Sequence, residues 1–192
     1  MLHEKPTSDP TPAAQLYSPT PGKPVLHLGC GKHIWEGCLN VDVVPLPGVD
    51  AVVDLNRLPW PFATGMWTKV VAHHVLEHLD DIVGAMRELH RILAPGGVAD
   101  IHVPHVAGWG AWNDLTHRHF FTRRSFLYFQ ADHDCNYYYD FAFASVRCRN
   151  VFGIGKSACL NSLLNPLLNN KLYDWLLWKV IPSAAIEITL VK

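Results

Sequence analysis

The segment VLHLGCG at residues 25–31 constrains this 192-residue chain more than any other. A short apolar run, typical of a buried strand, stops at two glycines that flank a cysteine. Glycine lets the backbone turn sharply and leaves the peptide bare, so that a ligand can approach it closely. Gly29 and Gly31, with Cys30 between them, therefore predict a ligand site at the end of a strand.

The segments that follow indicate an α/β protein. Short apolar runs bounded by turn residues predict strands at residues 25–30, 39–44, 50–56, 69–75 and 98–104. One helix is expected over residues 80–93, with Asp80 or Asp81 as its cap and an end at the APGG that follows. Several short apolar strands with one strong helix favour a mainly parallel sheet.

The last third of the chain predicts further elements. A short helix and then two strands are expected at residues 122–130, 140–148 and 184–191. A long helix is expected over residues 165–180, with Asn165 as its cap and Pro166 in its first turn. Its apolar stripe consists of Leu167, Leu168, Leu172, Trp175 and Leu176. This stripe is expected to pack on the sheet rather than on a membrane, because the polar face carries few charges.

Length and composition fit one globular domain with a short arm. A chain of this size buries about 70% of its unfolded surface, which is enough for a proper core. Residues 1–24 contain six prolines and predict a flexible arm, so that the domain is expected to span residues 25–192. A homodimer is left open.

Charge and cysteine content limit the partners and the compartment. The net charge of −1 gives no basic surface for nucleic acid or for an anionic membrane. No window has the apolar length of a membrane span, and the N-terminus lacks the apolar core of a signal peptide. The five cysteines form no CxxC pair, and we expect reduced thiols in a cytoplasmic protein.

Polar side chains stand at the ends of the strands after the first. Open parallel sheets bind ligands at the carboxyl ends of their strands, so these ends are expected to line one crevice. A carboxylate at Asp42 can accept both hydroxyls of a ribose, and Asp54 with Leu55 can meet an adenine. The fourth predicted strand ends in His73 and His74.

This crevice does not fit a dinucleotide. The NAD fingerprint needs GxGxxG at the start of a helix and an acid about 20 residues further on. Here the glycine spacing breaks down after Gly31, and Asp42 lies only 13 residues after Gly29. A pyrophosphate would also need a helix N-terminus, for which the chain leaves little room. An adenosine ligand without phosphates is favoured, and a nicotinamide oxidoreductase is disfavoured.

The order and spacing of these motifs resemble the class I S-adenosylmethionine-dependent methyltransferases over residues 25–130. LHLGCG resembles the first motif of that family, NVDVVP its ribose-binding segment and DLNRLPWPF its adenine-contact segment. HHVLEHLDD and ILAPGG resemble its fourth strand and the helix and strand that follow. The resemblance implies a Rossmann-like fold, with a mainly parallel seven-stranded sheet flanked by helices, and S-adenosyl-L-methionine as the cofactor.

The resemblance also implies cofactor-binding residues. These are Gly29, Cys30 and Gly31 at the amino acid part, Asp42 and Val43 at the ribose, Asp54 and Leu55 at the adenine, and His73 and His74 beside the methionine end. Two departures stand out: His27 replaces an acid that often precedes the first glycine, and the first helix is shortened to the loop KHIWEGC. Residues 113–126 further resemble the DPTHxxxFT segment of a small bacterial subgroup, with Leu115 in place of the proline.

The cluster of Asp114, His117 and His119 leaves three interpretations open: a metal site, an anchor for a loop, or substrate handling. Imidazole and carboxylate are good metal ligands. No further ligand set stands out, however, so no metal is predicted. Methyl transfer from a sulfonium depends mainly on alignment, and a hydroxyl acceptor adds the need for a base. The predicted base is His117 oriented by Asp114, with His74 as the rival.

Aromatic residues near this cluster suggest where the acceptor binds. Trp109 and Phe120 are expected to line its pocket together with His119. The PP[YFW] motif of the enzymes that methylate nucleic acid bases is absent. The predicted function is therefore methyl transfer to a small-molecule or glycan-like acceptor at oxygen. The alternative is a catalytically inactive S-adenosylmethionine-binding subunit or scaffold.

Overall fold

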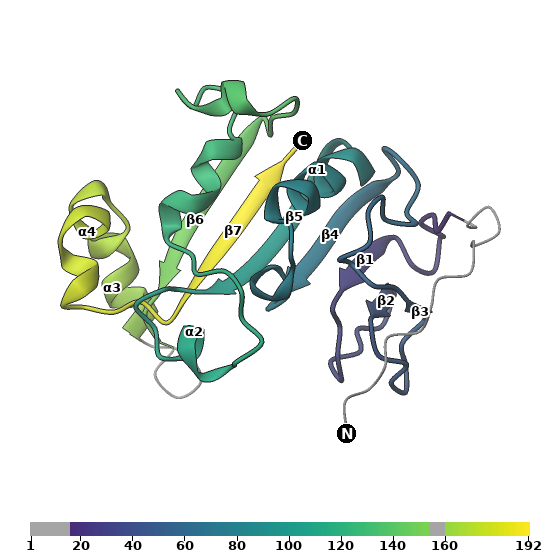
Figure 1. Ribbon diagram of the computed structural model, residues 1–192, viewed down its shortest axis with the longest axis horizontal. Helices are drawn as coiled ribbons and strands as arrows, with labels where there is room; N and C mark the ends of the chain where they lie inside the picture. The colour runs from purple at the N-terminus through teal and green to yellow at the C-terminus, as the bar shows by residue number, and fades with distance from the viewer. Residues whose placement is uncertain (1–15, 154–159) are drawn as a thin grey trace.

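A computed structural model describes residues 16–153 and 160–192 (Figure 1). A seven-stranded sheet with the order β3-β2-β1-β4-β5-β7-β6 runs through the molecule. Its strands are β1 (Val25–Leu28), β2 (Cys38–Asp42), β3 (Ala51–Val52), β4 (Trp67–His73), β5 (Leu93–Pro104), β6 (Ser145–Val151) and β7 (Ala185–Val191). Among these seven strands, β7 alone runs in the opposite direction, so its pairings with β5 and β6 are antiparallel and the other pairings are parallel. The predicted mainly parallel seven-stranded sheet is confirmed.

Helices and short 3₁₀ segments connect these strands. They are η1 (Leu76–His78), α1 (Ile82–Ile92), α2 (Gly110–Asn113), η2 (Arg123–Phe129), η3 (Asn136–Tyr138), α3 (Leu160–Leu168), α4 (Lys171–Trp175) and η5 (Leu177–Lys179). The cap of α1 is Asp81, whose carboxylate accepts a hydrogen bond of 2.8 Å from the Gly84 amide. A capping box between Thr122 and Ser125 starts η2.

The apolar core lies on the face of the sheet that α1 covers (Figure 1). Alternate residues of β4 and β5 are fully buried there, namely Val70, Ala72, Ala99 and Ile101. Met86 and Leu89 of α1 and Phe126 of η2 belong to the same cluster. Burial of each large apolar side chain stabilises the fold by about 1.5–3 kcal/mol.

The opposite face of the sheet is polar. The side chains that alternate with the core residues there include the exposed or half-buried Lys69, Asp100, Arg147 and Thr189, whereas Val71 and His27 are buried on this face. The chain joins β1 to β2 by a loop, as the shortened segment predicts. Trp35 of this loop lies on the polar face, with ring centroids 4.5 Å from His27 and 5.6 Å from His73.

The predicted long helix over residues 165–180 is wrong. The chain instead forms α3 with Pro166 inside it, and then a separate α4 capped by Asn170, whose side chain accepts a hydrogen bond of 2.9 Å from Tyr173. Side-chain amides end α3, because Asn169 donates to the Asn165 carbonyl at 3.1 Å and Asn170 also donates to a carbonyl of that helix. Asparagine competes in this way with helical hydrogen bonding.

The apolar stripe of the predicted helix does not pack on the sheet. Leu167, Leu172 and Trp175 are 61%, 56% and 74% exposed. The strand predicted over residues 140–148 also begins later than expected, at Ser145. The apolar alternation just before Ser145 does not come from a strand. It arises because the phenylalanines of this segment enter the core, as the fully buried Phe143 shows.

The N-terminal segment and the cysteines lie partly outside the described residues. Of the predicted arm, residues 1–15 are outside them, whereas Tyr17 exchanges backbone hydrogen bonds of 2.8 Å with Pro61 and Ala63. The described cysteines are free thiols, and Cys159 is outside the described residues. Every helix formed by residues 16–153 and 160–192 is too short or too polar to cross a bilayer.

Candidate functional site

Two adjoining cavities open where the parallel strands end. The first, here called the strand-end cavity, has a volume of about 310 Å³ and is lined by Gly29, Asp42, Val43, Val53, Asp54, Leu55, Asn56, His74, Val75, His78 and Leu79. The second, here called the outer groove, has a volume of about 670 Å³. Its lining residues are His74, Glu77, His78, Pro104, Trp109, Gly110, Asn113, Asp114, Leu115, His117 and Ala184. The two cavities therefore share His74 and His78.

The glycine corner forms one wall of the strand-end cavity. Gly29 and Gly31 both have positive φ, at 61° and 52°. A Cβ atom on Gly29 would lie 2.3 Å from a methyl group of Val75, so packing as well as conformation requires glycine there. Gly29 lines the cavity, whereas Cys30 is buried behind it and donates its amide to Val41.

Asp42 is held at the end of β2 by two backbone amides. Its carboxylate accepts hydrogen bonds from Gly31 at 2.8 Å and from Val44 at 3.0 Å. A carboxylate has about four lone-pair sites. Asp42 can therefore accept further hydroxyl groups from a ligand in the strand-end cavity.

The loop after β3 supplies the apolar side of the same cavity. Val53 and Leu55 are almost fully buried and form part of its wall. Asp54 lines the cavity and also stabilises its own loop by accepting a hydrogen bond of 3.0 Å from the Asn56 amide. Asn56 in turn accepts a hydrogen bond of 2.7 Å from Asp80 and so ties this loop to the start of α1. Sequence reasoning missed Val53 and Asn56, although both flank the predicted Asp54–Leu55 pair.

His74 stands at the junction of the two cavities. It is the one non-glycine residue with positive φ in the described part of the chain, at 56°. Its Nδ1 lies 3.2 Å from Oε1 of Glu77, and this contact raises the pKa of His74. Such backbone outliers cluster at functional sites.

Glu77 is the unexpected member of the site. Its side chain is only 1% exposed. Its Oε2 has no hydrogen-bond partner among the described residues. Ligand atoms of Glu77, His78 and His117 lie within 4.8 Å of one another. The sequence spacing of these three residues does not predict that the fold buries the carboxylate beside two imidazoles.

The predicted pairing of Asp114 with His117 is wrong. The Asp114 carboxylate accepts hydrogen bonds from the amide and the hydroxyl of Thr116, at 2.8 and 2.7 Å. The Nδ1 of His117 instead lies 2.9 Å from the carbonyl oxygen of Ala111. Short-range turn formation satisfies Asp114, so the backbone rather than a carboxylate orients His117.

The predicted acceptor residues separate into two groups. Trp109 lines the outer groove. His119 and Phe120 are not among the residues that line either cavity. The ring of Phe120 stacks on Trp112 at a centroid distance of 4.2 Å, and the ring of His119 lies 6.3 Å from that of Phe121.

His73 lies outside the strand-end cavity, although it was expected beside the methionine end of a cofactor. Successive strand residues point to opposite sides, and His73 points to the polar face of the sheet. There its ring stacks on that of His102 at a centroid distance of 3.8 Å. His73 lowers the pKa of the neighbouring Asp100, and burial lowers the pKa of His102.

Comparison with protein families gives a match. The model described as "Methyltransferase domain" matches residues 8–136, which is more than half of the chain. No curated protein sequence matches.

Solved structures with similar folds include several methyltransferases. An S-adenosylmethionine-dependent methyltransferase from Archaeoglobus fulgidus is 14% identical, with a TM-score of 0.61 over 90% of this chain and 87% of that chain. A possible histamine N-methyltransferase from Thermotoga maritima is 13% identical, with a TM-score of 0.54 over 90% and 83%. Phosphoethanolamine N-methyltransferase 2 from Haemonchus contortus, solved with S-adenosyl-L-methionine, is 15% identical, with a TM-score of 0.55 over 93% and 50%. At these identities the likeness establishes the fold.

Proposed function

Because the chain belongs to the methyltransferase domain family, we propose that it transfers a methyl group from S-adenosyl-L-methionine to a hydroxyl oxygen of a small-molecule or glycan-like acceptor. One observation supports this most directly: the strand-end cavity and the outer groove meet at His74 and His78. A cofactor in the cavity and an acceptor in the groove would bring the methyl group and the oxygen together there. Alignment of this kind supplies up to about 7–11 kcal/mol of a reaction barrier.

The residues of the strand-end cavity fit the cofactor. Asp42 keeps lone pairs for the ribose hydroxyls, and Val53 with Leu55 offers an apolar surface to the adenine. The bare backbone at Gly29 suits the amino acid part. The volume of about 310 Å³ lies at the lower end of the usual range for ligand pockets. When bound, the cofactor supplies an electrophilic methyl group on a positively charged sulfur.

The base is assigned to His74. Its Nδ1 is engaged by Glu77, so Nε2 is the atom left to take a proton from an acceptor hydroxyl. An orienting carboxylate of this kind is the usual support for a catalytic histidine. His117 lines the same groove but rests on the carbonyl of Ala111. Contact with Glu77 therefore favours His74 over His117, and general-base catalysis contributes about 10²- to 10⁴-fold.

The chemistry of the outer groove favours a small acceptor. Trp109, Leu115 and Pro104 give it an apolar side, and Glu77 and Asp114 give it an acidic one. The net charge of −1 disfavours a polyanionic substrate. The resemblance of residues 113–126 to a bacterial subgroup remains a prediction.

Binding experiments test the cofactor assignment. We expect calorimetric titration with S-adenosylhomocysteine to show a single site, and the variant Asp42→Asn to weaken binding by about tenfold, since it loses one good acceptor for the ribose. Asp132→Asn, at an exposed position outside both cavities, serves as the matched control. Tight binding of NAD without a response to S-adenosylhomocysteine would overturn the assignment.

Turnover is tested separately with labelled cofactor and a panel of hydroxyl-bearing small molecules and glycan precursors. Labelled product from the wild type, lost when the outer groove is altered by Trp109→Ala, supports methyl transfer. Cofactor binding without turnover of any acceptor would instead favour the inactive subunit or scaffold.

A further inference from the structure

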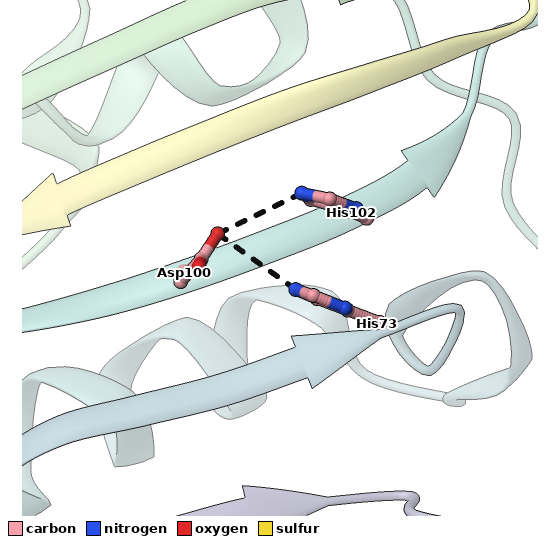
Figure 2. Close-up of side chains that lie close together, drawn as sticks. All are labelled: His73, Asp100 and His102. Atoms are coloured by element: carbon pink, nitrogen blue, oxygen red, sulfur yellow. Dashed lines mark ion pairs between the residues drawn. The ribbon is translucent and has the colours of Figure 1, made fainter. Parts of the chain in front are cut away.

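A second cluster of ligating side chains lies outside both cavities, on the polar face of the sheet (Figure 2). His73 ends β4, and Asp100 and His102 stand two residues apart on β5. The parallel register places His73 beside His102. Residues two apart in a strand point to the same face, so all three side chains project from one side of the sheet. Two central strands thus fix their positions.

The ligand atoms of this cluster converge. Nε2 of His73 lies 3.8 Å and Nε2 of His102 lies 3.7 Å from Oδ1 of Asp100, and Figure 2 shows both rings turned toward that oxygen. These distances are too long for hydrogen bonds. They are close to the separation of about 3.4 Å between two ligands of a tetrahedral zinc ion with bonds of about 2.0–2.1 Å.

Hydrogen bonding within the described residues does not account for this arrangement. Nε2 of His73 is buried and has no partner there. The rings of His73 and His102 are within 7° of parallel, so two protonated rings would repel each other directly. Rotation of one ring about its Cβ–Cγ bond would turn both Nε2 lone pairs toward one point, where a cation shared with the Asp100 carboxylate would satisfy all three groups.

The charged side chains around the cluster do not block its ligand atoms from a cation. Lys69 lies 3.9 Å from the other oxygen of Asp100, Oδ2. Glu187, opposite His102 on β7, accepts a hydrogen bond of 2.8 Å from Arg149 and so is already paired. The side chains of His73, Asp100 and His102 are 24%, 34% and 32% exposed, which leaves a solvent side for a further ligand.

We propose that His73, Asp100 and His102 form a binding site for a divalent transition metal ion of the zinc class. Two imidazoles and one carboxylate suit such ions, whereas Mg²⁺ and Ca²⁺ prefer oxygen ligands. The fourth position faces solvent, where water completes the coordination. The site is separate from the cavities at the strand ends, and this inference does not depend on the proposed methyl transfer.

Titration with Co²⁺, followed by visible absorption, tests the site in the full chain after treatment with a chelator. We expect one tightly bound ion, displaced by Zn²⁺. The variants Asp100→Asn and His102→Gln each remove one ligand and should weaken binding by at least about tenfold. Lys69→Met removes a neighbouring positive charge and should leave binding as tight as in the wild type or tighter.

Two further histidine variants locate the ion. His33→Gln changes an exposed histidine outside the cluster, and His117→Gln changes the other group of possible ligands, with Glu77 and His78. Both should bind Co²⁺ as the wild type does. Zn²⁺ should raise the melting temperature of the wild type and of both controls but not of Asp100→Asn, whose melting temperature without metal reports whether it folds.

Three outcomes would overturn the proposal. They are the absence of Co²⁺ binding by the wild type, unchanged binding by both Asp100→Asn and His102→Gln, and a loss of binding caused by His117→Gln alone.

Discussion

Nδ1 of His74 lies 3.2 Å from Oε1 of Glu77, a carboxylate that the fold buries almost completely. Burial of an ionised carboxylate is costly unless a partner offsets it. His74 is that partner, and its own backbone adopts an unusual positive φ to reach the position. The His74–Glu77 contact therefore stabilises the fold and also holds His74 at the junction of the two cavities.

Replacement of His74 tests whether it acts as the base. Asparagine tolerates positive φ and keeps a side-chain amide that can donate to Glu77, so His74→Asn should fold while methyl transfer falls by about 10²- to 10⁴-fold. Affinity for S-adenosylhomocysteine should change little, because Asn keeps the backbone of the cavity wall. Single-turnover kinetics and calorimetry measure the two effects. His117→Asn with the larger loss of rate would reverse the assignment.

Replacement of Glu77 should alter the pH dependence of the same reaction. Glu77 raises the pKa of His74, and a base acts in its deprotonated form. In Glu77→Gln the pKa of His74 falls, so the acidic limb of the pH–rate profile should move to lower pH. The maximal rate should also fall, because the ring loses its orienting carboxylate. An acidic limb that stays in place would show that a different group titrates.

Acid should destabilise the fold through His105. Its side chain is 2% exposed, and burial lowers its pKa to about 4 from 6.5. Between these values the unfolded chain binds the proton and the folded chain does not, so stability falls as the pH falls. The loss between pH 7 and pH 5 amounts to about 2 kcal/mol for this shift.

Urea unfolding at the two pH values measures that loss. In His105→Asn the amide oxygen can accept the hydrogen bond that His105 Nδ1 now accepts from Ala107 at 3.0 Å. This variant should show a smaller difference between pH 7 and pH 5 than the wild type. An equal difference in both proteins would assign the acid sensitivity to other groups.

The two aspartates before α1 should differ in their effect on stability. Asp81→Ala removes the cap and should cost about 1 kcal/mol. Asp80 pairs with Arg118 at the surface, where both side chains are more than half exposed, so Asp80→Ala should cost less than about 1 kcal/mol. Thermal unfolding of the two variants gives the comparison, and a larger loss for Asp80→Ala would contradict the assignment of the cap.

The two glycines of the first corner should also differ. Alanine at either position meets an unfavourable positive φ, which costs about 1–2 kcal/mol. At Gly29 it also meets Val75, whereas at Gly31 nothing lies within 4 Å of the added Cβ. Gly29→Ala should therefore be the less stable variant in chemical denaturation. Adding Val75→Ala to Gly29→Ala should restore part of the lost stability. If it restores none, the positive φ alone accounts for the cost of alanine at this position.

Short-range sequence patterns predicted the helix and strands that depend mainly on residues close together in the sequence. The helix over residues 80–93 and the strands around it follow from apolar periodicity and from turn residues, and the structure contains them with shifted ends. The strand-end aspartates Asp42 and Asp54 were found because parallel strands end at a common edge. The prediction of one long helix after residue 165 is wrong because asparagines in this segment end one helix and cap another.

Contacts between distant segments could not be predicted in the same way. Asp114 and His117 are neighbours in sequence, yet each satisfies its hydrogen bonds elsewhere. Glu77 looks like an ordinary helix-start residue until the fold buries it. His73 was placed with His74, but strand alternation sends the two side chains to different sites.

The position of β7 has a consequence for biosynthesis. This strand is the last of the seven to leave the ribosome, yet it lies between β5 and β6, and β6 pairs with no other strand of the sheet. A nascent chain that has completed β6 therefore carries that strand unpaired and an open edge on β5. Exposed edges of this kind invite association between chains. We expect this sheet to be complete only after β7 has left the ribosome.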